Sequence, residues 1–157
     1  MQLIITTPGG VAVDGYNKVI VDIPTPDKIA DVPFVTTPGG INYVLTDNGD
    51  FIITGTGSIE EETFSSTVKK AIKHAFIVNG ISLIDSFAFQ SCSSLTSITI
   101  PDSVTRIGYQ AFRRCSNLTS IVLGKGITSI EPLFEDCSSL TNIVIPDSVT
   151  SIDASAF

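Results

Sequence analysis

The chain has 157 residues, enough for one domain with a buried core. Hydrophobic residues make up 43% of it and charged residues only 16%, which excludes a disordered chain. The net charge is −7, and Lys and Arg do not cluster beyond Lys69-Lys70 and Arg113-Arg114, so we expect no nucleic-acid partner. No apolar run reaches the length of about 18 residues that spans a bilayer, so we expect no membrane insertion.

Residues 1–40 predict a β-rich N-terminal arm. Two strand-like runs, Val11 to Val13 and Lys18 to Ile23, are separated by Asp14-Gly15-Tyr16-Asn17, and residues 24–33 read as a linker. A unit of this size is too small to be stable alone. We therefore expect the arm to pack on the rest of the chain or on another chain.

Residues 41–57 predict a hairpin that caps the following domain. Two β-rich runs, 43–46 and 51–54, flank Asp47-Asn48-Gly49-Asp50, and Asn-Gly between such runs is a strong hairpin signal. The same four residues resemble the start of a calcium loop, but the later ligands of that loop do not follow. We therefore read them as a turn and predict no metal site there.

Residues 58–157 predict a solenoid built from repeats of 22–23 residues. Four phenylalanines, Phe89, Phe112, Phe134 and Phe157, lie 23, 22 and 23 residues apart. Each repeat contains L-x-x-I-x-I, whose alternation is typical of a short strand, and Pro101 and Pro146 end two of these strands. Stacked coils would place the inward isoleucines in parallel ladders.

The cysteines and the single histidine do not predict a catalytic or metal site. Cys92, Cys115 and Cys137 occupy the same position of successive repeats, which predicts a column of buried thiols. A straight column of three cannot supply the tetrahedral set that zinc requires. His74 lies in an outward position of a strand with no evident third member of a catalytic triad, so we expect a simple exposed side chain.

The repeat resembles the BspA-like leucine-rich repeat family over residues 58–157, through S-L-T-S-I-x-I-P-D-S-V-T-x-I followed by A-F-x-x-C. Residues 46–59 resemble the segment that often precedes these repeats. The resemblance implies a mainly β, right-handed leucine-rich-repeat solenoid with short parallel strands and short helical or 3-10 turns. It also implies non-catalytic surface proteins, extracellular or on the bacterial cell surface, that adhere to host or matrix proteins.

The outward positions of the predicted strand face are the candidate protein-binding residues. They combine apolar and small polar side chains, and exposed apolar stripes often mark contact surfaces. The alternative is that the arm of residues 1–40 covers this face, and the sequence leaves both interpretations open. The candidate residues are His74, Phe76, Val78, Ser97, Thr99, Ser120, Val122, Asn142 and Val144.

Two functions follow from the sequence, neither of them enzymatic and neither with a cofactor. The first is a protein-binding or adhesion module at a bacterial cell surface, with a protein or glycan ligand. The second is a structural or assembly protein, phage- or virion-associated, that forms a homo-oligomer through its arm or its open solenoid end. The second is favoured by residues 1–10, which lack the regions of a signal peptide, by the arm, and by the last coil, which stops mid-repeat at Phe157. The strength of the repeat match favours the first. Residues 14–21 also resemble short segments of phage structural proteins.

Overall fold

The structure is a computed structural model that describes residues 11–13, 19–21, 35–37 and 39–157. In the predicted arm, β1 (Val11–Val13) pairs with β2 (Val19–Val21) in an antiparallel hairpin. These strands correspond to the two strand-like runs of the sequence. The linker predicted for 24–33 lies outside the described residues.

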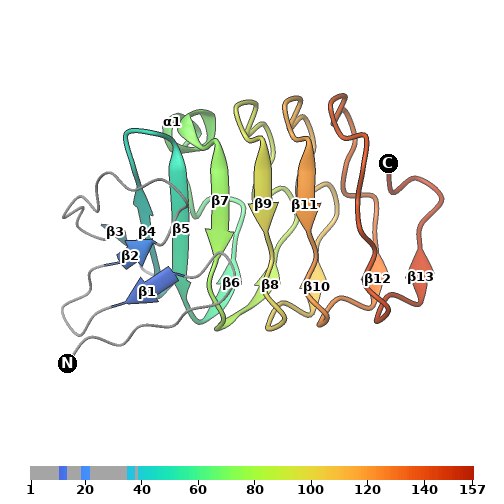
Figure 1. Cartoon of the computed structure of the whole chain (residues 1–157), viewed down its shortest axis with the longest axis horizontal. Helices are drawn as coiled ribbons and strands as arrows, with labels where there is room; N and C mark the ends of the chain where they lie inside the picture. Colours follow the sequence, from blue (N-terminus) through green and yellow to red (C-terminus); the bar gives the residue numbers. More distant parts are fainter. Residues whose placement is uncertain (1–10, 14–18, 22–34, 38) are drawn as a thin grey trace.

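A six-stranded sheet forms one long side of the molecule (Figure 1). Four of its strands are parallel and come from successive coils: β5 (Asp50–Gly55), β7 (His74–Ile77), β9 (Ser97–Thr99) and β11 (Ser120–Val122). At one edge the chain adds β4 (Ile41–Leu45) and β3 (Val35–Thr36), both antiparallel to their neighbours. The predicted hairpin is therefore present, and its second strand is also the first parallel strand of the solenoid.

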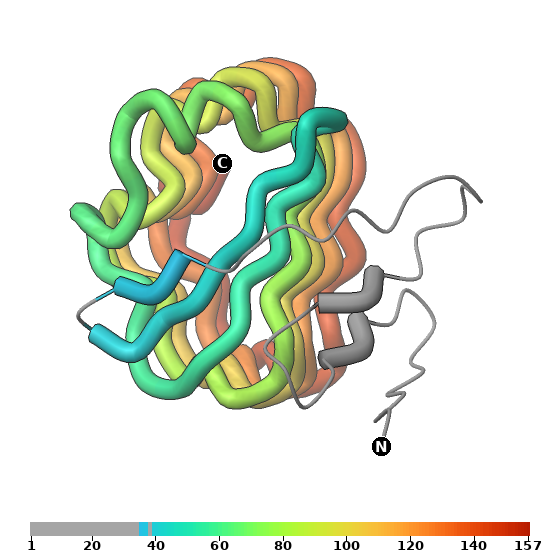
Figure 2. The backbone as a smooth tube through the Cα atoms, turned by 90° about the vertical axis from the view of Figure 1, so that its left-hand side faces the viewer, coloured from blue at the N-terminus to red at the C-terminus, as the bar shows by residue number. Residues whose placement is uncertain are grey.

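Shorter strands from successive coils form two further parallel sheets. One sheet contains β6 (Gly57–Ile59), β8 (Ile81–Ile84) and β10 (Arg106–Ile107), and another pairs β12 (Ser129–Ile130) with β13 (Ser151–Ile152). Viewed along the axis, the coils lie behind one another (Figure 2). The mainly β solenoid expected from the repeat is confirmed.

The strand predicted in the last repeat is much reduced. Of the segment 140–145, only Val144 pairs, through a single bridge to Val122. Its inward residues, Ile143 and Ile145, remain only partly buried beside the core. A strand at the edge of a sheet has a ladder on one side only, which explains why the pairing weakens here.

In each coil a bend leads from the shorter strand to the next strand of the six-stranded sheet. These bends are single hydrogen-bonded turns rather than helices, except in the first coil. There α1 (Ser66–Ala71) is capped by Ser65, whose hydroxyl accepts a hydrogen bond from the Val68 amide at 3.3 Å. In the next coil the Cys92 amide donates to Phe89 O at 3.2 Å, an i to i+3 bond of the 3-10 type. The coils are joined here too, because the Phe89 amide donates to Ala111 O at 2.9 Å.

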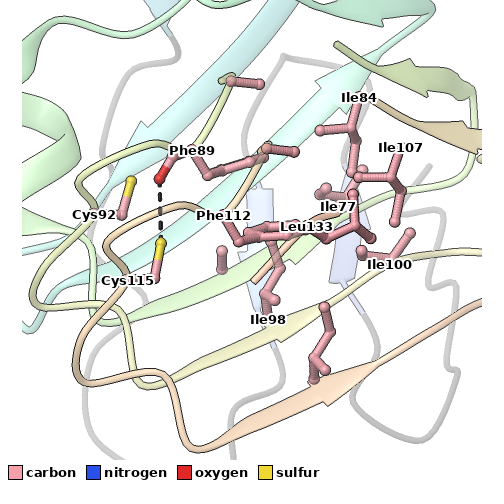
Figure 3. Packing of buried hydrophobic residues seen from close by; sticks show 14 of the residues in the cluster. Ile77, Ile84, Phe89, Cys92, Ile98, Ile100, Ile107, Phe112, Cys115 and Leu133 are labelled. Carbon is pink, nitrogen blue, oxygen red and sulfur yellow. Dashed lines mark hydrogen bonds between the residues drawn. The ribbon is translucent and has the colours of Figure 1, made fainter. Parts of the chain in front are cut away.

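The core consists of columns that run along the solenoid axis (Figure 3). Phe89, Phe112, Phe134 and Phe157 stack with ring centroids 5.6, 5.8 and 5.4 Å apart and planes within 15°. The cysteines are free and buried, as predicted. The thiols of Cys115 and Cys137 donate to the carbonyl of the phenylalanine in the preceding coil at 3.2 and 3.0 Å. Each repeat thus places the same residue types on top of one another.

Candidate protein-binding face

Seven of the nine candidate residues lie on the outer face of the six-stranded sheet, opposite the core. Strand side chains alternate between the two faces, and Ala75, Ile77, Ile98 and Ile121 point into the core. Their neighbours in sequence therefore point outward. Strand pairing arranges these outward residues in two rows that cross the strands.

The first row is apolar except for one threonine. Phe76 on β7 pairs with Thr99 on β9, Thr99 pairs with Val122 on β11, and Val122 forms the bridge to Val144. Phe76 is half-buried, whereas Val122 and Val144 are 57% and 73% exposed. This row therefore presents apolar surface to solvent at its Val144 end.

The second row is polar. His74 pairs with Ser97, and Ser97 pairs with Ser120 on the next strand. The Nδ1 atom of His74 lies 3.0 Å from Ser97 Oγ and 3.1 Å from Thr96 Oγ1. His74 is therefore half-buried and hydrogen-bonded, rather than the simple exposed side chain expected from the sequence.

Two candidates lie outside the paired strands. Val78 follows β7 directly, is half-buried, and donates its amide to Ile53 O at 2.9 Å. Asn142 is exposed in the last coil, two residues before Val144. The structure thus brings seven of the nine candidates into the two rows, with Val78 and Asn142 at their margins.

Sequence reasoning missed three residues that extend these rows across the hairpin. Asp50 pairs with His74 and continues the polar row, while Ile52 pairs with both Phe76 and Val44 and continues the apolar row. All three are buried. A signal for this was available: residues 51–53 form an unbroken apolar run, which is typical of a strand that is buried on both faces.

The polar row contains the residue types of a hydrolase triad, in the order Asp50, His74 and Ser97. Two observations argue against that chemistry. Among the described residues, no hydrogen bond joins Asp50 to His74. The Ser97 amide, which corresponds to one of the oxyanion donors of the chymotrypsin arrangement, instead donates to Lys73 O at 3.3 Å. The described residues therefore join the His74 imidazole to the Ser97 hydroxyl but do not join the buried Asp50 to the imidazole as a triad would.

Metal and membrane sites receive no support from the described part of the chain. In it, no three side chains of His, Cys, Asp or Glu gather closely enough to hold a metal ion. The single helix among the described residues, α1, has six residues, and no helix there has the length and apolar character needed to cross a membrane.

The sequence of residues 46–157 matches the family described as BspA type leucine rich repeat region, in six copies. The chain belongs to this family of leucine-rich repeat proteins. No curated protein matches the sequence.

Solved structures of bacterial leucine-rich repeat proteins resemble the chain. One, from Eubacterium ventriosum, is 28% identical with a TM-score of 0.57, and the match covers 73% of this chain and 38% of that protein. Another, from Bacteroides capillosus, is 29% identical with a TM-score of 0.50, and the match covers 77% of this chain and 88% of that protein. The chain thus spans well under half the length of the Eubacterium ventriosum protein.

Proposed function

We propose that the chain is a non-catalytic protein-binding module and that it contacts its partner through the outer face of the six-stranded sheet. The observation that carries this proposal is the apolar row that ends in Val122 and Val144, 57% and 73% exposed. Neither side chain belongs to the core cluster, so the fold does not account for them. Membership in a leucine-rich repeat family supports the same role, since stacked repeats provide extended binding surfaces.

The chemistry of the face fits a folded protein better than a small molecule. The row of Phe76, Thr99, Val122 and Val144 crosses successive strands about 4.8 Å apart, so it forms a shallow stripe with a polar row beside it. Apolar centres with polar rims are typical of protein interfaces. Adhesion at a bacterial cell surface is the setting that we propose for this binding, on the strength of the family.

The test is a binding measurement with purified matrix proteins. Collagen, laminin and mucin would be passed over the immobilised chain, and over the variants Val122→Asp and Val144→Asp. A charge in the centre of an interface should weaken binding by about 2 kcal/mol, roughly 30-fold in Kd. Both substituted side chains are exposed, so circular dichroism should show an unchanged fold.

Thr128→Asp provides the matched control, because Thr128 is exposed and lies outside the six-stranded sheet. This variant should bind like the parent chain. If the parent binds a matrix protein and both valine variants bind it equally well, the outer face is not the contact surface. If the parent binds none of the three, adhesion to matrix proteins is not its function.

Surface location is tested separately, in cells that carry the chain. Antibodies against residues 46–157 should label intact cells and lose that signal after mild protease treatment. Labelling that appears only after lysis would contradict the proposed location.

A further inference from the structure

The outer face of the sheet is closed at one end and open at the other. Val44, Ile52 and Phe76 lie in the same row as Val122 and Val144, because each pairs with the next across the strands. Val44 is nevertheless only 4% exposed and Ile52 is 0% exposed. Neither belongs to the core cluster on the inner face of the sheet.

The neighbouring strands cannot account for this burial. The principal contacts of β5 are with β4 and β7, which lie beside it in the same sheet. Strand neighbours shield the sides of an outward side chain but leave its tip open, as the exposure of Val122 shows. In Figure 2 the coloured coils return on the core side of the sheet only. A further segment must therefore lie over Val44 and Ile52.

We propose that the β1–β2 hairpin packs across the outer face of β4 and β5 and covers Val44 and Ile52. The hairpin reads Val-Ala-Val and Val-Ile-Val, so both of its strands are wholly apolar. A hairpin of two short strands is at best marginally stable alone in water and requires an apolar surface. A second β layer on the exposed side of a sheet is the arrangement of a β-sandwich.

The small size of the hairpin explains why only one end is covered. Residues 22–34 join β2 to β3, and β3 pairs with β4 at the edge of the sheet. A connection of this length reaches at most about 45 Å when fully extended, which exceeds the roughly 19 Å of four strand spacings between Ile52 and Val144, so the connection alone does not select one end. The strands of the hairpin are three residues long, about 10 Å, so a hairpin that lies on Val44 and Ile52 does not extend to Val144 at the opposite edge of the sheet.

This interface leaves Thr99, Val122 and Val144 open and places Phe76 at the boundary. The inference does not depend on the proposed function, since it concerns contacts within one chain and its test measures no partner. The prediction is that an outward position under the hairpin is inaccessible to solvent reagents, and that this protection requires an apolar hairpin.

Thiol labelling of the full chain provides the test. Single variants Ile52→Cys and Val44→Cys report on the covered end, and Val144→Cys reports on the open end. The native cysteines are buried and free, so the parent chain gives a low background. With an aromatic disulfide reagent, we expect Ile52→Cys and Val44→Cys to react at least about tenfold more slowly than Val144→Cys.

Each reporter is then combined with Val19→Asp/Ile20→Asp. Adjacent residues of a strand point to opposite faces, so this pair places a charge on whichever face docks. We expect the tenfold difference to fall to less than about twofold, with circular dichroism unchanged. The matched control is Asn17→Asp, a charge placed between the two strands in sequence, which should preserve the protection.

Three outcomes would overturn the proposal. Rapid labelling of Ile52→Cys with the native hairpin would mean that the face is open. Slow labelling that persists with Val19→Asp/Ile20→Asp would mean that another segment covers it. Protection that disappears on dilution would mean that the hairpin of a second copy, rather than the same chain, covers the face.

Discussion

The phenylalanine column provides the sharpest test of the solenoid core, through the substitution Phe112→Ala. Phe112 is 0% exposed and stacks between two rings, with centroids 5.6 Å from Phe89 and 5.8 Å from Phe134. Removing the ring opens a cavity in the middle of the column. Such substitutions cost about 3–5 kcal/mol, which includes the transfer of the ring and the cavity that remains.

Phe157→Ala is the matched control, because it removes the same ring from the same column. Among the described residues, Phe157 stacks only against Phe134, at 5.4 Å, and it is 63% exposed. Full burial of a phenylalanine contributes about 1.5–3 kcal/mol, so the buried third of this ring contributes about 0.5–1 kcal/mol. The two substitutions should therefore differ by at least about 2 kcal/mol.

Urea unfolding followed by circular dichroism measures the difference. With a slope of about 2 kcal/mol/M, Phe112→Ala should lower the midpoint by about 1.5–2.5 M and Phe157→Ala by less than about 0.5 M. Because the stability of a domain is about 5–15 kcal/mol, the alanine variant could lose its fold. Phe112→Leu then serves as the second variant, with an expected loss of about 1–2 kcal/mol. Equal losses at positions 112 and 157 would refute the proposed column energetics.

Two further predictions concern the approach of successive coils and the thiol column. Gly124→Ala should destabilise the chain by about 1–3 kcal/mol, because the added Cβ would collide with the Pro101 carbonyl and lie 2.7 Å from the Asp102 amide nitrogen. Gly39→Ala is its control, since the only atom of the described residues that a Cβ there would meet is Thr37 Oγ1, at 4.0 Å. Equal urea midpoints for the two variants would contradict the close approach. The native thiols should react with an aromatic disulfide only after denaturation. A hydrogen bond with the Cys115 side chain and, to a smaller extent, burial raise the pKa of the Cys137 thiol. The higher pKa favours the protonated thiol, which is unreactive. Rapid reaction in the folded chain at neutral pH would show that the column is open to solvent.

The repeat spacing predicted most of the solenoid for a simple physical reason. Each coil pairs with the coils on either side of it, so equivalent residues must stack, and stacking preserves residue type at a fixed interval. The columns of phenylalanine, cysteine and isoleucine were therefore visible before the structure. The outward positions followed from the same period, because their neighbours are fixed in the core.

The helix α1 could not be predicted from the same signal. It occupies a bend that is a tight turn in later coils, and its six residues are too few for an isolated helix to be stable in water. Packing rather than propensity stabilises such a segment. The Ser65 cap is a weak signal in a chain in which serine is common at bends.

The backbone conformation of the bends could not be predicted from the sequence either. Phe87 and Gln110 occupy equivalent positions before Ala-Phe, and both have positive φ, at 61° and 52°. Residues other than glycine rarely adopt this conformation, so residue type gives no indication of it. The third bend has Pro132 at that position, whose ring fixes φ near −65°. This repeat is one residue shorter, and its described positive φ is confined to Asp136, at 61°.

The burial of Ile52 shows why the two interpretations of the outer face need not compete. Sequence reasoning treated the face as either a contact surface or a surface that the arm covers. The apolar row is longer than either interpretation assumed, since it begins at Val44 and ends at Val144. One end of the row is buried as completely as the core, while at the other end Val122 and Val144 are each more than half exposed.

A hairpin that lies beside β4 accounts for the burial of the first end only, because its strands are three residues long. A partner that binds the second end would meet the edge of the hairpin at Phe76. The Val19→Asp/Ile20→Asp variant should therefore alter labelling at Ile52→Cys without abolishing binding that depends on Val144.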